Sequence, residues 1–180
     1  MKNSKAENLL RWSLLILVLL FATYGCVRVQ PVAQHPSQSA SDNPVVIRSV
    51  AADYDQVWSD LTMALNERGL VISSVSHVGE MLERTGKALN DNTKIFARAK
   101  VMEFCSAIIS RKMMEKDPHY IAFCPYQIMV YSLPQDPGKV YLAYRRLLWG
   151  HVKDRAVLEA VENLLDGLVT EVIEMQEEYK

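Results

Sequence analysis

The sequence predicts an α+β fold, in which an antiparallel sheet of about five strands has a long C-terminal helix packed across one face. Short runs of β-branched and aromatic residues recur between turn residues, which indicates strands. An apolar stripe at helical spacing from about Asp154 to Glu178 indicates a helix of roughly 37 Å, long enough to cross a sheet. With 180 residues, 49% of them hydrophobic, the chain can bury one sizeable core, so we expect a single domain over residues 45–180.

Residues 1–26 have the layout of an export signal. Lys2, Lys5 and Arg11 precede an almost unbroken apolar run, and a small residue stands before Cys26. The uncharged segment is shorter than the roughly 20 apolar residues that span a bilayer, which favours a signal over a permanent span. We therefore expect the domain to lie outside the cytoplasm.

Gly25-Cys26 resembles the end of a bacterial lipobox, in which the cysteine is lipidated and becomes the mature N-terminus. Thr23 and Tyr24 depart from the usual lipobox residues. The favoured interpretation is a lipid-anchored protein of the cell envelope, on the periplasmic side of a bacterial membrane. An uncleaved N-terminal anchor and a soluble secreted product are the alternatives. Residues 27–44, rich in Gln, Ser and Pro, predict a flexible tether.

The first half of the domain predicts two strands and two helices. Val45-Val46-Ile47 begins a strand, Asp53 is a suitable N-cap for the helix that follows, and Gly69 is a suitable end for that helix. Residues 70–76 predict a strand that its serines place at an edge or half-exposed position. Residues 79–87 predict a short helix.

The next strand is expected over residues 95–102, where two sets of side chains alternate. We expect Ile95, Ala97, Ala99 and Val101 to form its core face, and Phe96, Arg98, Lys100 and Met102 a mixed face.

Two elements complete the predicted domain. Asp136-Pro137-Gly138 predicts the turn of a hairpin between a strand at Tyr126 and one at Val140-Tyr141-Leu142, because proline and glycine suit the second and third turn positions. The long helix is expected to bury Leu158, Val161, Leu165, Leu168, Val172 and Met175.

Residues 102–131 predict a strand, a short helix, a loop and a second strand. Cys105 closes the first strand, Ser106 is a suitable N-cap for the helix, and Cys124 opens the second strand. If the strands are regular, both sulfur atoms point to one side of the sheet, so we expect them to meet.

The chain resembles the bacterial domain-of-unknown-function family 302. The resemblance begins near Tyr54-Asp55-Gln56-Val57 and includes Val101-Met-Glu-Phe-Cys105 and Phe123-Cys-Pro-Tyr-Gln-Ile-Met-Val-Tyr131, so it covers roughly residues 45–178. Ser106-Ala107 and Arg145-Arg146-Leu147 stand where members of the family often carry Asn-Pro. The resemblance implies a fold and transfers no catalytic residue.

An exported protein with three cysteines is expected to use Cys26 for lipid and to join Cys105 with Cys124 in a disulfide. Two alternatives remain for this pair, namely two reduced buried cysteines and a functional dithiol. Met113, Met114, His119 and Cys124 are a weaker candidate set of soft ligands for copper.

Arg145 and Arg146 could contact an anionic ligand or partner, although solvated charges at a strand end are the favoured interpretation. A net charge of −1, with basic residues dispersed among acidic ones, gives no reason to expect nucleic acid. The sequence also leaves a homodimer open.

The sequence carries no nucleophile elbow, phosphate-binding glycine loop or His-Glu-x-x-His motif. We therefore expect no cofactor and a non-catalytic, membrane-tethered domain that binds a protein or small ligand, or has an envelope-structural role. The alternative is a periplasmic thiol-redox or metal-handling protein that uses Cys105 and Cys124. An enzyme with an unfamiliar site is a third possibility.

Overall fold

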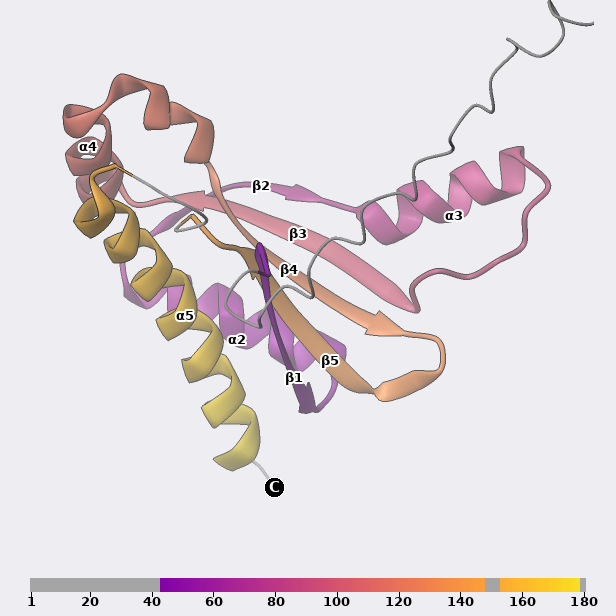
Figure 1. Cartoon of the computed structure of the whole chain (residues 1–180). Helices are drawn as coiled ribbons and strands as arrows, with labels where there is room; N and C mark the ends of the chain where they lie inside the picture. The colour runs from indigo at the N-terminus through magenta and orange to yellow at the C-terminus, as the bar shows by residue number, and fades with distance from the viewer. Residues whose placement is uncertain (1–42, 148–152, 179–180) are drawn as a thin grey trace, which may run out of the picture. The chain divides into compact units, whose positions relative to one another are not determined.

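A computed structural model describes residues 43–147 and 153–178 (Figure 1). They form one unit with its own core. The elements follow in the order β1 (Val45–Ala51), α2 (Tyr54–Glu67), β2 (Val71–Ser76), α3 (Val78–Ala88), β3 (Arg98–Cys105), α4 (Ala107–Lys116), the 3-10 helix η2 (Pro118–Phe123), β4 (Tyr126–Leu133), β5 (Asp136–Arg145) and α5 (Arg155–Glu178).

The five strands form one antiparallel sheet in the order β1-β5-β4-β3-β2. Together with the 24-residue helix α5, it confirms the predicted α+β fold. The serine-rich strand β2 lies at an edge, as its composition indicates, and β1 forms the opposite edge. The central strands β3, β4 and β5 therefore have all their neighbours within the sheet.

Local sequence signals set the ends of α2. Asp53 Oδ1 accepts hydrogen bonds from the backbone N–H groups of Asp55 at 2.8 Å and Gln56 at 3.0 Å, which confirms the predicted N-cap. Gly69 has a φ of +65°, a left-handed conformation that costs other residues energy, and it turns the chain from α2 toward β2.

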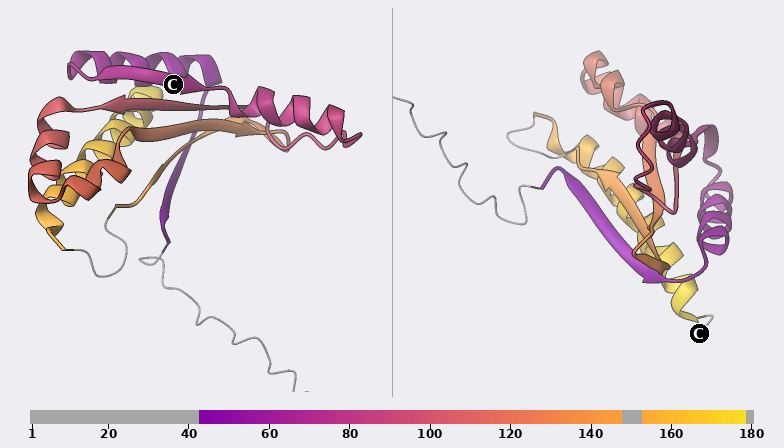
Figure 2. Two further views of the ribbon diagram at one scale, coloured as in Figure 1. Left: turned by 90° about the horizontal axis from the view of Figure 1, so that it is seen from above. Right: turned by 90° about the vertical axis from the view of Figure 1, so that its right-hand side faces the viewer.

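The core lies on the face of the sheet that α2 and α5 cover. Figure 2 shows α2 running along one side of the strands. On β1, Arg48 points to the same side, where its guanidinium contacts Asp166 Oδ1 at 2.6 Å and Thr170 Oγ1 at 2.8 Å on α5. Fully buried residues of this core include Val57, Leu61 and Leu65 from α2, Met102 and Phe104 from β3, Ile128 and Val130 from β4, Leu142 from β5, and Leu158, Leu165 and Leu168 from α5.

The predicted orientation of β3 is wrong. Met102 and Phe104 are fully buried in the core, whereas Ala99 and Val101 are half-buried on the other face. Ile95, expected in the core, is 52% exposed and precedes the strand. Alternation identifies two faces of a strand but does not say which one the helices cover.

The predicted hairpin is present, but its turn lies three residues earlier than expected. Pro134 and Gln135 form the turn, and Leu133 pairs with Asp136. Tyr131 pairs with Tyr141, and Leu133 pairs with Asp136. Between these two pairs lie one residue of β4 and four residues of β5, residues 137–140. Pro137 and Gly138 therefore lie in a bulge of β5, where proline and glycine are also well suited.

Candidate functional site

A row of polar side chains crosses four strands on the face of the sheet opposite the core. Arg145 Nη2 on β5 donates to Gln127 Oε1 on β4 at 2.5 Å, and Gln127 Nε2 donates to Glu103 Oε1 on β3 at 2.9 Å. Ser74 Oγ on β2 donates to the other carboxylate oxygen of Glu103 at 2.6 Å. Because each member accepts from or donates to the next, the row fixes the direction of the Arg145 guanidinium.

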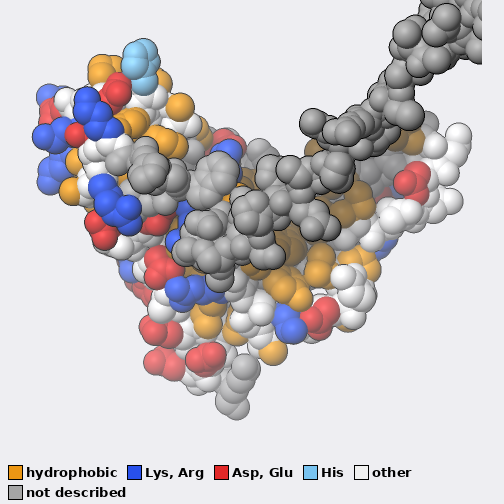
Figure 3. All heavy atoms as spheres, viewed as in Figure 1, with side chains coloured by type: hydrophobic (Ala, Val, Ile, Leu, Met, Phe, Trp, Pro, Cys, Tyr) orange, Lys and Arg blue, Asp and Glu red, His pale blue; other side chains and the backbone are white. Residues whose placement is uncertain are grey.

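An apolar groove, the sheet groove, lies beside this polar row and has a volume of about 440 Å³. Register explains its composition, because Ile47 pairs with Ala143, Ala143 with Met129, and Met129 with Val101 across four strands. Figure 3 shows hydrophobic side chains over the strands on the face turned to the viewer. Two charged residues, Lys100 and Arg145, line the groove, and its other lining residues are Val45, Ile47, Val78, Phe96, Ala99, Val101, Met129, Tyr131 and Ala143.

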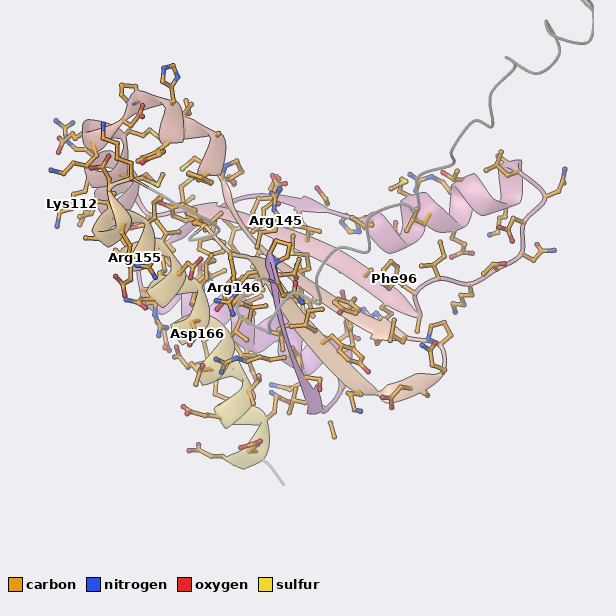
Figure 4. All side chains as sticks on the ribbon, viewed as in Figure 1. Phe96, Lys112, Arg145, Arg146, Arg155 and Asp166 are labelled. Atoms are coloured by element: carbon orange, nitrogen blue, oxygen red, sulfur yellow. The ribbon has the colours of Figure 1, made fainter. Side chains whose placement is uncertain are left out.

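Aromatic rings close the end of the sheet groove that is far from the polar row. Tyr131 stacks on Tyr141 with ring centroids 5.1 Å apart, and Phe96 meets Tyr131 edge to face at 5.6 Å. Burial, and then the neighbouring Tyr141, raise the pKa of Tyr131, so its phenol stays neutral at physiological pH. Arg145 and Phe96 both line the groove, and Figure 4 labels them at separate places along the sheet.

Arg145 and Arg146, the predicted contacts for an anion or partner, have different surroundings. Arg145 is exposed, and it lines both the sheet groove and a second hollow of about 220 Å³. Arg146 is half-buried beside that second hollow, with Nη1 3.9 Å from Glu162 Oε2. Of these two arginines, only Arg145 therefore lines the sheet groove. Lys100 lines it too, and its Nζ lies 5.1 Å from the centroid of the Trp58 ring on α2.

Cys105 and Cys124 meet at the end of the sheet where β3 gives way to α4. Their sulfur atoms are 3.5 Å apart, and both residues are thiols in the structure. The meeting follows from the chain path, because Ser106 caps α4 with a 3.4 Å contact to the Ile109 N–H and η2 then returns the chain to β4. The proximity that the sequence predicts is confirmed, and the disulfide itself stays a prediction.

The surroundings of Cys105 keep its thiol protonated near neutral pH. Burial, and then the hydrogen bond with Cys124, raise the pKa of Cys105 to about 11. Ser110 Oγ lies 3.3 Å from Cys124 Sγ and 2.9 Å from the Tyr126 hydroxyl. Burial also raises the pKa of Tyr126, to about 12. A thiol of raised pKa is a weak nucleophile near pH 7, unlike the activated thiols of redox enzymes.

The candidate copper ligands are spread over different environments. Met113 is fully buried in the core, Met114 is half-buried, and His119 is exposed on η2. In residues 43–147 and 153–178, no three His, Cys, Asp or Glu side chains are grouped to hold a metal ion. Met113 has a packing role that accounts for its position.

The anchor region is not part of the described structure. Cys26 and the predicted leader, residues 1–26, lie outside the described residues, as does all of the tether except Asn43 and Pro44. Within the part of the chain that the structure describes, none of the helices has the length and apolar character needed to cross a membrane.

Sequence reasoning missed the polar row and the sheet groove. The available signal was the alternation of Gln127, Met129 and Tyr131 with the core residues of β4, because an outward face with two apolar members is unusual for a strand covered on one side only. Assigning the site also requires the strand order and register, which bring Arg145 and Glu103 into one row.

Comparison with known proteins agrees with this fold. No curated protein matches the chain at a significant level. A crystal structure of an uncharacterised conserved DUF302 protein from Bacillus stearothermophilus is similar, with a TM-score of 0.57 and 17% sequence identity over 72% of this chain and 95% of that chain. The profile of the family "Domain of unknown function DUF302" matches residues 46–175. The chain therefore belongs to the DUF302 family of domains of unknown function.

Proposed function

We propose that the protein is an exported, membrane-tethered domain that binds a ligand without catalysing a reaction. The sheet groove carries this proposal, because an apolar hollow that is open among the described residues and lies beside an oriented charged group is typical of a binding site. Its volume of about 440 Å³ falls in the usual range of roughly 300–1,000 Å³ for ligand pockets. The described groove residues include no pair of nucleophile and base in contact.

The sequence of the leader supports the tethered part of the proposal. Lipidation at Cys26 would place several acyl chains at one residue, and each buried methylene contributes about 0.8 kcal/mol to membrane attachment. The tether over residues 27–44 would then let the domain stand clear of the lipid surface.

The cysteine pair supports an oxidising compartment. Cys105 and Cys124 need to approach by only about 1.5 Å from their 3.5 Å contact to form a bond of about 2.05 Å. A disulfide closing this loop would contribute about 3 kcal/mol in the chain-entropy model. Its role would be to fasten α4 and η2 to the sheet.

Expression of the full chain in a bacterium tests the export and the anchor. We expect wild-type protein to take up a palmitate analogue and to sediment with membranes, and the Cys26→Ser variant to lose the label. Thiol alkylation before and after reduction should show Cys105 and Cys124 protected in cells. Unlabelled, cytosolic wild-type protein with two reactive thiols would contradict the proposal.

A second candidate function is thiol redox chemistry, favoured by the contact between Cys105 and Cys124. The raised pKa of Cys105 opposes it, since exchange catalysts depend on an accessible thiolate. Equilibration in glutathione buffers separates the two functions. A structural disulfide should resist the glutathione pool, with a potential below about −300 mV, whereas a catalytic one should be reduced readily.

A further inference from the structure

We propose that the sheet groove holds the hydrocarbon chain of a long-chain carboxylate, with the carboxylate group at Arg145. The inference rests on the proposed binding function and names the class of ligand.

The apolar part of the site suits an alkyl chain. Four strands contribute Ile47, Ala143, Met129 and Val101 in one continuous row, and Tyr131 lies beside it. Ile47 is 54% exposed, so an unoccupied groove leaves a large apolar side chain in water. A bound chain would remove this apolar surface from water, which favours binding.

The charged part of the site suits a carboxylate. The Arg145 guanidinium has no carboxylate within 4.0 Å among the described residues, and its one side-chain partner there is the neutral amide of Gln127. Glu103 does not compete for it, since Gln127 and Ser74 already donate to both oxygens of that carboxylate. Arg145 therefore keeps donors for an incoming anion and is held in one direction.

Other occupants fit less well. A peptide laid on the groove would bury its own N–H and C=O groups against apolar side chains, and the backbone groups of the central strands are already paired within the sheet. A second copy packed face to face would bury the charged side chains of Arg145 and Glu103 in both copies, which costs free energy of desolvation. An alkyl chain with one terminal charge avoids both costs.

Calorimetry on residues 43–180 tests the proposal with two probes of equal chain length, dodecanoate and 1-dodecanol. The segment has its own core, and the similar crystallised chain has nearly the same extent. We expect dodecanoate to bind with a stoichiometry of one. Arg145→Gln should weaken dodecanoate about tenfold or more and leave 1-dodecanol unchanged, because it removes a charge-assisted contact.

The groove variant is Ile47→Glu, which places a carboxylate among the apolar side chains at an exposed position of an edge strand. It should weaken both probes. Matched controls are Ile108→Glu, at a side chain that is 70% exposed on α4, and Arg111→Gln, which removes a charge on the same helix. Neither control should change binding.

Four results would overturn the proposal. The first is that dodecanoate does not bind, and the second is that Ile47→Glu leaves its binding unchanged. The third is that Arg145→Gln weakens the binding of both probes equally. The fourth is that light scattering shows a wild-type dimer, which Ile47→Glu dissociates. None depends on the lipid anchor, so wild-type protein that takes up no palmitate label in cells would count against the tether and leave this inference standing.

Discussion

Gln176 Nε2 on α5 donates a hydrogen bond to Asp60 Oδ2 on α2, although the two residues are 116 positions apart in the chain. Both are almost fully buried, with exposures of 5% for Gln176 and 3% for Asp60. Gln56 Nε2 donates to the other carboxylate oxygen of Asp60 at 2.8 Å. The Asp60 carboxylate is thus satisfied from both helices, and it links α2 to α5 within the core.

The variant Gln176→Ala should lower the free energy of unfolding by about 2 kcal/mol, because it leaves one oxygen of a buried carboxylate without a donor. Denaturant unfolding measures this, with the exposed Glu177→Ala as the control expected to change stability by less than about 0.5 kcal/mol. The double variant Asp60→Leu with Gln176→Leu should lose less unfolding free energy than the sum of the losses in the single variants Asp60→Leu and Gln176→Leu. Additive losses would show that the two side chains do not interact.

Gln176 also shows how much of the buried face of α5 could be predicted from the sequence. The helical stripe of Leu158 to Val172 predicted the buried face, and these residues are buried. The same stripe predicted Met175, which is half-buried, while the core receives Gln176. Periodicity ranks positions by hydrophobicity and therefore overlooks a polar side chain whose partner lies on another helix.

Prediction of the candidate site from the sequence meets the same limit. The caps at Asp53 and Ser106 and the contact of Cys105 with Cys124 depend on residues close in sequence or on a short excursion of the chain, so they could be predicted. The sheet groove depends on the register of β1 and β5 and on which face the helices leave open. No local pattern contains that information.

The reduced protein should lose stability as the pH rises from about 9 to about 11. The pKa of Cys105 is raised from 9.0 to about 11, so in this range the unfolded chain releases a proton that the folded chain keeps. The stabilisation is fully present below pH 9. Tyrosines whose pKa is raised also lower the stability of the folded protein as the pH rises, and they do so in the reduced and the oxidised protein alike. The measurement is therefore the difference in unfolding free energy between these two forms.

Formation of the disulfide removes the Cys105 proton from both states, so the oxidised protein should lack this component. Its advantage over the reduced protein should be about 3 kcal/mol near neutral pH and should grow above pH 9. A difference that is independent of pH would mean that the Cys105 thiol titrates alike in the folded and unfolded chains.

Substitutions in the candidate copper set should separate packing from metal binding. Met113→Ala should lower stability by about 2–5 kcal/mol, since it opens a cavity at a fully buried position. His119→Ala, at an exposed position, should change it by less than about 0.5 kcal/mol. Thermal unfolding with and without Cu(I) provides the check. A rise in the unfolding temperature with Cu(I) that His119→Ala abolishes would restore the metal interpretation.

Two glycines should respond in opposite directions to alanine. A Cβ at Gly79 would lie 2.9 Å from the backbone nitrogen of Ala99, because α3 approaches β3 closely there. Gly79→Ala should therefore push α3 from the sheet and cost about 1–3 kcal/mol. A Cβ at Gly167 would meet nothing within 4 Å, so Gly167→Ala should stabilise α5 by about 0.5–1 kcal/mol.

The glycine pair also bears on the sheet groove, since Val78 of α3 and Ala99 of β3 both line it. Displacement of α3 by Gly79→Ala should weaken the binding of dodecanoate and 1-dodecanol alike, because it alters the apolar wall and leaves Arg145 in place. Gly167→Ala should raise stability without changing either affinity. If Gly79→Ala lowers stability but leaves both affinities at their wild-type values, α3 is not a wall of the binding site.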